Sequence, residues 1–298
     1  MKKLIVHIGY HKTGTSFLNR KFFPIHPDIF HLGKPYDDDD PIREFTERVI
    51  GVRRYDVERC KALYNEYIKP IRENKITSIS DGRIVNHIAN NNLRDIPERL
   101  LNITKDVSVI MVIRRQYDYL KSLYVQRVGA ANEKKSFNEW FDSNWENGIR
   151  LNKQVDYLAK IQAYLDILGK ENVGIFIYES FREDAGGFTH DLCNFIGLDC
   201  TSLKRELVNN EKINQRMTTL HQFISTHLVF NYIAIMVKKI LSDRVRGSIR
   251  NLIFNNFNSY NPELSVDRIR LVQESAMVVN NRLISELNLD LYRYNYDI

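Results

Sequence analysis

Residues 4–18 read LIVHIGYHKTGTSFL, and this stretch decides the fold. The apolar run Leu4–Ile8 predicts a buried strand, and Thr15–Phe23 has the pattern of a helix. Gly9 and Gly14 bound the tight turn between the two. Unpaired N–H groups at the start of a helix attract anions, and glycine lets an anion approach the backbone closely. A glycine-containing turn without a ligand is the alternative, but the full string favours a phosphate-binding loop.

Three further runs predict strands, at Ile76–Ser80, Val107–Ile113 and Val173–Ile177. Helical patterns precede the first and the last of them, over Val57–Glu73 and Leu151–Leu168. The run Val107–Ile113 is continuously apolar, which is typical of a strand buried on both faces. Strands that alternate with helices predict an α/β fold, in which a central parallel β-sheet is flanked by helices.

The last third of the chain changes pattern, because 215–246 and 264–287 read as helices with no clear strand between them. We find no internal repeat and no low-complexity linker. We therefore expect one domain over 1–298, with a nucleotide-binding α/β core over 1–200 and a mainly helical extension over 201–298.

The loop differs from a Walker A phosphate loop at one decisive position. The spacing from Gly9 to Gly14 matches that motif, which continues with lysine and then serine or threonine. Here Thr15 occupies the lysine position and the lysine comes earlier, as Lys12. The apolar third strand ends in Arg114 rather than in the aspartate that holds Mg²⁺ in a P-loop enzyme. Both differences argue against the first alternative, a P-loop nucleotide kinase or NTPase.

The string Lys12–Phe17 resembles the 5′-phosphosulfate loop of sulfotransferases that use 3′-phosphoadenosine 5′-phosphosulfate (PAPS), and GYHKTGTS is most similar to bacterial carbohydrate-type members. The resemblance implies a P-loop-like sulfotransferase fold and no metal. It also implies that Lys12 stabilises the charge on the departing phosphate. The residues then expected to bind the 5′-phosphosulfate are Lys12, Thr13, Gly14, Thr15, Ser16 and Phe17.

A second match follows the strand Val107–Ile113. In the family, an arginine at the strand end and a serine eight residues later bind the 3′-phosphate, and Arg114 and Ser122 have this spacing. Arginine can bind phosphate through two parallel hydrogen bonds. The proline common in this motif is absent here. A basic strand end and a serine on a helix surface, without a ligand, are the alternative.

The third match is the strand that ends in Tyr178, which resembles the family's Tyr-Glu-Asp segment. The resemblance implies that Tyr178 packs near the adenine, although a tyrosine that fills the core is a close alternative. The family also closes its nucleotide site with a basic or Asn-rich loop. Residues 212–216, with Arg216, and residues 244–247 are the two candidates for it.

The acceptor side needs a base that takes the proton of the attacking hydroxyl. In the family this base is a His or Glu near the end of the strand that corresponds to Ile76–Ser80. The first candidate here is Asp81, and His11 and His87 are the alternates. An aspartate at a turn or helix N-cap has the same local pattern, so the sequence favours neither a base nor a turn residue at Asp81. The resemblance implies an acceptor hydroxyl or amine, on a sugar of a polysaccharide or glycolipid.

Composition sets the remaining limits. A net charge of +6 favours anionic partners without identifying them. The three cysteines, Cys60, Cys193 and Cys200, include no CxxC pair, which argues against a disulfide framework or a Cys-rich zinc site and favours a reducing cytoplasm. No apolar segment has the length of a membrane span.

Two alternatives concern partners. A non-catalytic module that binds nucleotide or nucleic acid is compatible with the basic charge, but the chain carries no recognised nucleic-acid motif, so we expect no nucleic-acid partner. The segment 227–250 joins an apolar stretch to a basic one, which allows peripheral contact with anionic lipid at the inner face of a membrane. A core helix with an exposed basic end is the preferred interpretation.

Overall fold

The computed structural model describes residues 4–10, 12–33, 40–69, 75–82, 84, 92–131, 133–200, 203 and 260–298. The chain divides into two compact units, which are described separately. The first contains Met1–Arg115, Lys153–Glu211 and Ser275–Ile298, and the second contains Gln116–Asn152 and Lys212–Glu274. The expected division into a core and a helical extension stays a prediction.

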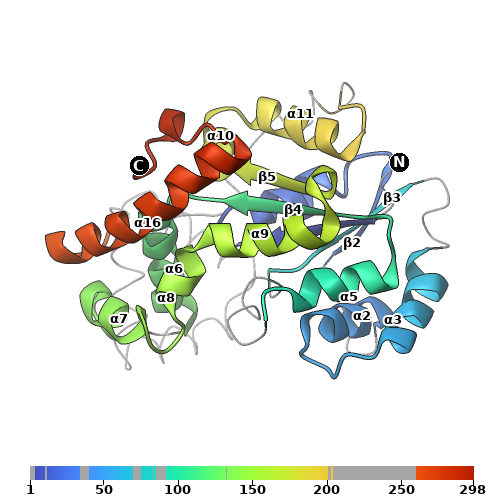
Figure 1. Ribbon diagram of the computed structural model, residues 1–298, viewed down its shortest axis with the longest axis horizontal. Coiled ribbons are helices and arrows are strands. Elements are labelled where there is room, and N and C mark those ends of the chain that lie inside the picture. The colour runs from blue at the N-terminus through green and yellow to red at the C-terminus, as the bar shows by residue number, and fades with distance from the viewer. Residues whose placement is uncertain are drawn as a thin grey trace, which may run out of the picture. The chain divides into compact units, whose positions relative to one another are not determined.

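A five-stranded parallel sheet forms the centre of the first unit, in the order β2-β3-β1-β4-β5 (Figure 1). The strands are β1 (Leu4–Gly9), β2 (Ile29–Gly33), β3 (Ile76–Ser80), β4 (Val107–Ile113) and β5 (Val173–Ile177). All residues of β1, β3 and β4 are buried, because these three strands lie inside the sheet and are covered on both faces. The four expected strands and the parallel sheet are confirmed.

Strand β2 was not expected from the sequence. Its five residues, IFHLG, include His31 in the middle and Gly33 at the end, so they form no apolar run. The strand lies at the sheet edge and pairs only with β3. Only Ile29 is fully buried in it, so the burial that shapes the other strands is weak here.

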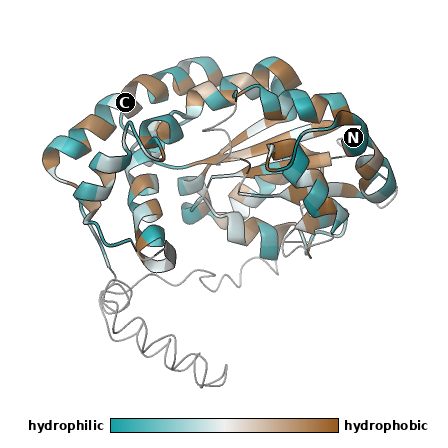
Figure 2. Cartoon of the chain, turned by 90° about the horizontal axis from the view of Figure 1, so that it is seen from below, coloured by the Kyte–Doolittle hydropathy of each residue, from teal (hydrophilic) through white to brown (hydrophobic). Residues whose placement is uncertain are grey.

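Helices cover the sheet in two layers. The connection from β1 runs toward the β2 edge of the sheet, whereas the connections from β3 and β4 run toward the β5 edge. Because crossovers between parallel strands are right-handed, connections in opposite directions place their helices on opposite faces of the sheet. Neighbouring helices of one layer contact each other: α2 with α3 and α5, and α5 with α9. Figure 2 shows the strands largely in the hydrophobic colour and the helices with both colours. The helices of the first unit are α1 (Thr15–Phe17), η1 (Leu18–Phe22), α2 (Pro41–Ile50), α3 (Val57–Leu63), η2 (Tyr64–Ile68), α5 (Asp95–Ile103), α9 (Tyr157–Leu168), η4 (Lys170–Asn172), α10 (Tyr178–Glu183), α11 (Ala185–Ile196) and η6 (Tyr292–Tyr294).

The described part of the second unit is helical and contains α6 (Gln116–Ala131) and α7 (Phe137–Asn144). Helix α7 starts with a capping box, in which Ser136 and Glu139 satisfy each other's backbone N–H groups. Two helices, α8 (Leu151–Val155) and α16 (Val266–Leu287), run from one unit into the other. Helix α16 confirms the helix expected over 264–287. The regions 215–246 and 227–250 lie outside the described residues. Among the described residues, no helix has the length and hydropathy to cross a membrane.

The cysteines require a correction. Cys193 and Cys200 form a disulfide with a Cα–Cα distance of 6.0 Å, and Cys60 is a free, buried thiol. Three cysteines can form one disulfide and leave one free thiol. The expectation of reduced cysteines is therefore wrong for this pair, because a spacing of seven residues brings two cysteines together when a helix ends between them.

Candidate functional site

The loop after β1 has the backbone of a tight anion loop. Lys12 and Gly14 both have positive φ, 67° and 83°, so the loop enters the left-handed region twice before α1 begins. The conformation is easy for glycine and costs energy for lysine. A Cβ at Gly9 would lie 2.8 Å from Oγ1 of Thr15, so only glycine lets the helix start lie this close to the strand end. Helices α1 and η1 then run without a break over Thr15–Phe22.

Two threonine hydroxyls form hydrogen bonds that hold this loop against the end of β1. Thr13 Oγ1 donates to the carbonyl of Tyr10 at 2.6 Å, and Thr15 Oγ1 donates to the same carbonyl at 3.3 Å. Thr13 is buried, with 1% of its surface exposed. Its hydroxyl proton is therefore used inside the loop, and the first-turn N–H groups of the helix are the donors suited to an anion.

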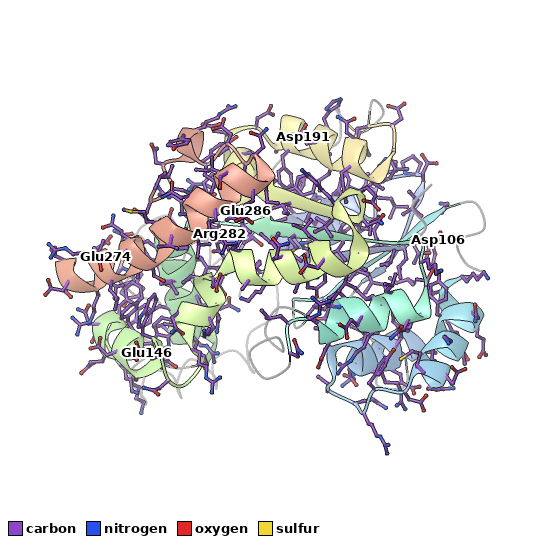
Figure 3. All side chains as sticks on the ribbon, viewed as in Figure 1. Asp106, Glu146, Asp191, Glu274, Arg282 and Glu286 are labelled. Carbon is purple, nitrogen blue, oxygen red and sulfur yellow. A yellow bond between two sulfur atoms is a disulfide. The ribbon has the colours of Figure 1, made fainter. Side chains whose placement is uncertain are left out.

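Two of the predicted cations lie together at this loop. Arg114 Nη1 donates to the carbonyl of Lys12 at 2.9 Å, and the guanidinium lies 4.8 Å from the centre of the Tyr178 ring. Arg114 Nε is buried and has no hydrogen-bond partner among the described residues. Burial, and then repulsion from Arg114, lower the pKa of Lys12. No carboxylate of the described residues lies within ion-pair distance of either cation, whereas carboxylates such as Asp106 and Asp191 lie exposed on the surface (Figure 3).

Aromatic rings close the back of the loop. Phe17 is buried and lies 4.6 Å from the ring of Phe181 on α10. A Cβ at Gly14 would come 3.5 Å from Phe181 and 3.8 Å from Tyr178. Phe17 therefore stabilises the loop from inside, and adenine packing by Tyr178 stays a prediction.

Partly buried hydrogen bonds hold the ends of β4 and β5 beside the loop. The hydroxyl of Tyr157 donates to the Arg114 carbonyl at 2.7 Å. Glu179 accepts from the backbone N–H of Arg115 at 3.2 Å and from the hydroxyl of Tyr296 at 2.9 Å. Burial raises the pKa of Glu179. The carboxyl-terminal residues of the chain thus help to fix the strand end that carries Arg114.

Lys160 on α9 is a buried cation that the sequence analysis did not single out. Its Nζ donates to the carbonyl of Gln154 at 3.1 Å and lies 5.0 Å from the centre of the Tyr10 ring. Burial lowers the pKa of Lys160 to about 7. The helical spacing Tyr157, Lys160, Tyr164 was a usable signal, because it places the lysine on the buried face of α9.

Two imidazoles lie inside the sheet near the loop. His7 Nδ1 lies 2.7 Å from the hydroxyl of Ser80, and His31 Nδ1 lies 2.7 Å from that of Ser78. Burial lowers the pKa of His7 to about 3 and that of His31 to about 4. Both rings are therefore neutral at physiological pH and act as hydrogen-bonding groups.

Asp81 follows β3 directly and is buried, with 1% of its surface exposed. Its carbonyl accepts from the N–H of Ile84 at 3.1 Å, so a turn does begin here. The backbone supports the turn interpretation and leaves the carboxylate compatible with the role of a base. The alternates His11 and His87 lie outside the described residues.

The described structure does not test the remaining predicted residues. Ser122 lies on α6 in the second unit, half-buried, and its role at the 3′-phosphate stays a prediction. Arg216 and the segments 212–216 and 244–247 lie outside the described residues.

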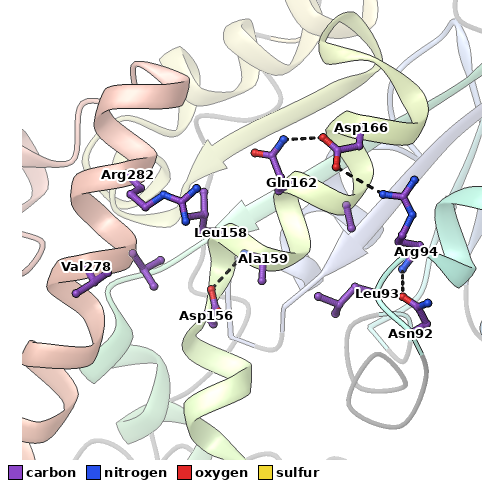
Figure 4. Close-up of a pocket in the computed structure, with 12 residues that line it drawn as sticks. Asn92, Leu93, Arg94, Asp156, Leu158, Ala159, Gln162, Asp166, Val278 and Arg282 are labelled. Atoms are coloured by element: carbon purple, nitrogen blue, oxygen red, sulfur yellow. Dashed lines mark hydrogen bonds and ion pairs between the residues drawn. The ribbon is translucent and has the colours of Figure 1, made fainter.

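A separate cavity of about 530 Å³ lies between the start of α5, α9 and the first-unit part of α16 (Figure 4). Its charged groups already have partners: Arg94 pairs with Asp166 at 3.6 Å, and Arg282 pairs with Glu286 at 2.7 Å. Asp156 accepts from the N–H of Ala159 and caps α9. None of the predicted site residues lines this cavity, and its paired charges give no reason to expect an anion in it.

Comparison with known proteins gives the family. The sequence model of the sulfotransferase domain matches residues 2–274. A sulfotransferase from Alicyclobacillus acidocaldarius is similar in structure, with a TM-score of 0.52 and 20% identity over 67% of this chain and 83% of that one.

Two further structures are less similar. A mouse sulfotransferase crystallised with PAP has a TM-score of 0.45 and 13% identity over 71% of this chain and 68% of its own. A sulfotransferase from Mycobacterium avium has a TM-score of 0.45 and 13% identity over 80% of this chain and 76% of that one. A search of curated protein sequences found no match. The family match covers nearly the whole chain, the sheet and its flanking helices agree with that fold, and this chain therefore belongs to the sulfotransferase domain family and is a transferase enzyme.

Proposed function

We propose that this enzyme transfers a sulfuryl group from PAPS to a hydroxyl or amine of a carbohydrate acceptor. The observation that carries the proposal is the contact between Arg114 and the Lys12 carbonyl. It joins the cation at the end of β4 to the phosphate loop after β1, from positions 102 residues apart. A donor with a 5′-phosphosulfate and a 3′-phosphate fits two neighbouring cations better than a donor with one anionic end.

Electrostatics favour an anion at this place. Lys12 and Arg114 repel each other, and repulsion from Arg114 contributes to the lowered pKa of Lys12. An anion that binds between or beside them relieves that repulsion and raises the pKa of Lys12 again. The first-turn N–H groups of α1 add donors that need no lysine at the position of Thr15.

The proposed transfer step uses residues of two strand ends. The acceptor oxygen attacks the sulfur, and the bond from sulfur to the bridging phosphate oxygen breaks, so that 3′,5′-ADP leaves. Lys12 stabilises the charge that grows on the departing phosphate. Asp81, at the end of β3 beside β1, accepts the proton of the acceptor hydroxyl.

The carbohydrate acceptor rests on a single line of support, the similarity of GYHKTGTS to bacterial carbohydrate-type members. It is tested apart from the donor. Purified enzyme and ³⁵S-labelled PAPS are incubated with a panel of polysaccharides, glycolipids, phenols and amines. Transfer to sugars supports the proposal, and exclusive transfer to phenols or amines overturns the acceptor class without affecting the donor.

The donor is tested by calorimetry. We expect 3′,5′-ADP to bind tightly without Mg²⁺ and ADP to bind much more weakly. Arg114→Ala should weaken 3′,5′-ADP binding roughly 10- to 100-fold, which is the range for a charge-assisted hydrogen bond, and should abolish the preference for the 3′-phosphate. Arg182→Ala is the matched control, because Arg182 is an exposed arginine on α10.

The same titration can refute the donor assignment. If ADP or ATP binds as tightly as 3′,5′-ADP, or binds only with Mg²⁺, the loop recognises another phosphate ligand. Equal losses in Arg114→Ala and Arg182→Ala would remove Arg114 from the 3′-phosphate site.

A further inference from the structure

Three side chains with sulfur or imidazole groups meet inside the first unit, away from the phosphate loop. His26 follows η1, Cys193 lies on α11, and Cys200 follows that helix. All three are buried, and a ring nitrogen of His26 lies within 4.8 Å of both sulfurs. The two cysteines form a disulfide. Such a set has two uses in proteins, as ligands of a soft metal or as a thiol–disulfide pair with a proton donor.

The hydrogen bonds of His26 distinguish the two uses. The backbone N–H of Asp28 donates to His26 Nδ1 at 3.1 Å, so Nδ1 carries a lone pair. Burial lowers the pKa of His26, against the opposing effects of Asp28 and Asp199, and a neutral ring then carries its proton on Nε2. A histidine that ligates a metal through one nitrogen normally donates from the other. Here the other nitrogen faces a donor, which argues against a metal.

The remaining nitrogen is suited to a sulfur anion. His26 Nε2 is buried and makes no hydrogen bond of normal geometry among the residues described, although the Asp199 backbone lies close enough to raise the pKa of the ring. As an N–H group it can donate to a thiolate, and such a donor favours the thiolate over the disulfide. We propose that Cys193 and Cys200 form a reversible thiol–disulfide site, in which the Nε2–H of His26 stabilises the thiolate that appears when a cellular dithiol reduces the pair.

The exposed fractions of the two cysteines indicate which sulfur the dithiol attacks first. Cys200 is 7% exposed and Cys193 is 1% exposed. A thiolate of the dithiol attacks Cys200 Sγ and forms a mixed disulfide, and Cys193 leaves as the thiolate beside His26. The second thiol of the dithiol then displaces Cys200. In total the dithiol, which enters as a monothiolate, gives two electrons and one proton and becomes a disulfide, while Cys200 becomes a thiol and Cys193 the thiolate beside His26.

The site lies behind the elements that carry the phosphate loop. Helix η1 continues α1 and ends shortly before His26. Helix α11 packs on α10, whose Phe181 contacts Phe17 of α1. The proposal does not depend on the identity of the donor nucleotide, because it concerns only the thiol chemistry.

The test counts thiols in the native protein. In a Cys60→Ala background the two remaining cysteines are the only thiols of the chain. The protein is equilibrated with buffers of graded ratio of reduced to oxidised dithiothreitol, which is a dithiol, and is then alkylated and weighed by mass spectrometry. We expect zero thiols in the most oxidising buffer, two in the most reducing one, and full reversal between them.

His26→Asn is the decisive variant, because its side-chain oxygen can accept from Asp28 while the Nε2 donor is lost. We expect the equilibrium to shift at least about tenfold toward the disulfide, which is about 30 mV for a two-electron couple. His190→Asn is the matched control, since His190 is an exposed histidine on α11, and it should cause no shift.

Three results would overturn the proposal. The first is a disulfide that dithiothreitol opens only after denaturation, and wild type decides this even if His26→Asn does not fold. The second is an equal effect of His26→Asn and His190→Asn. The third is stoichiometric Zn²⁺ binding by the reduced protein that His26→Asn abolishes, because it would assign a metal site.

Discussion

Replacing Lys160 with methionine removes a buried ammonium group and keeps a side chain of similar length. In the folded protein Lys160 is 5% exposed, and its pKa lies at about 7 instead of the ordinary 10.5. Between these two values the unfolded chain binds a proton that the folded chain does not. The free energy of unfolding of the wild type therefore rises with pH through this window, and Lys160→Met loses that dependence.

The magnitude follows from the two pKa values. Their difference corresponds to about 5 kcal/mol, an upper bound on the cost of the charged lysine below pH 7. Integrating the proton uptake from pH 7 to pH 9 gives a gain of about 2 kcal/mol for the wild type relative to Lys160→Met. The variant also leaves the Gln154 carbonyl without the lysine donor, which costs about 1 kcal/mol at either pH. That cost cancels in the comparison between the two pH values.

Denaturant unfolding of both proteins at pH 7 and pH 9 measures this difference directly. Other titrating groups are shared by the two proteins, so they cancel as well. A stability difference between variant and wild type that is the same at both pH values would refute the argument, because the ammonium would then not titrate in this window.

Three further predictions concern the site and its supports. Gly9→Ala should weaken 3′,5′-ADP binding at least about tenfold, because a Cβ would lie 2.8 Å from Thr15 Oγ1 and displace the helix start; calorimetry measures it. Asp81→Asn should lower kcat at least about 100-fold and leave nucleotide affinity unchanged, as steady-state kinetics and titration would show. Tyr296→Phe removes a donor to the half-buried Glu179 and should lower the free energy of unfolding by about 1–3 kcal/mol in denaturant melts.

Two of these predictions have a matched control variant. Gly186→Ala puts a Cβ no closer than 3.3 Å to Asp184 Oδ1, and it should bind 3′,5′-ADP normally. Tyr292→Phe alters a tyrosine that is 64% exposed and should leave stability unchanged. Unchanged kcat in Asp81→Asn would assign Asp81 to the turn alone, and equal stabilities of Tyr296→Phe and Tyr292→Phe would show that the Glu179 contact contributes nothing.

Local patterns in the sequence were sufficient for the core of the fold. The runs at Leu4–Ile8 and Val107–Ile113 predicted buried strands, and the structure confirms them. The glycine spacing and Lys12 predicted the loop, since a strand, a turn and a helix start are determined by neighbours in the chain. The sequence patterns did not predict strand β2, because it lies at the sheet edge, where a weakly buried strand needs no apolar run.

Contacts between distant parts of the chain were decided only in three dimensions. No local pattern joins Arg114 to the Lys12 carbonyl, or Tyr296 to Glu179, because each pair is more than 100 residues apart. The same holds for His26 and its two cysteines. The sequence by itself determined the parallel sheet, the loop and the residue types of the site. Tertiary packing decided which cations lie together and which lysine is buried, because burial and through-space charge depend on elements brought together only by folding.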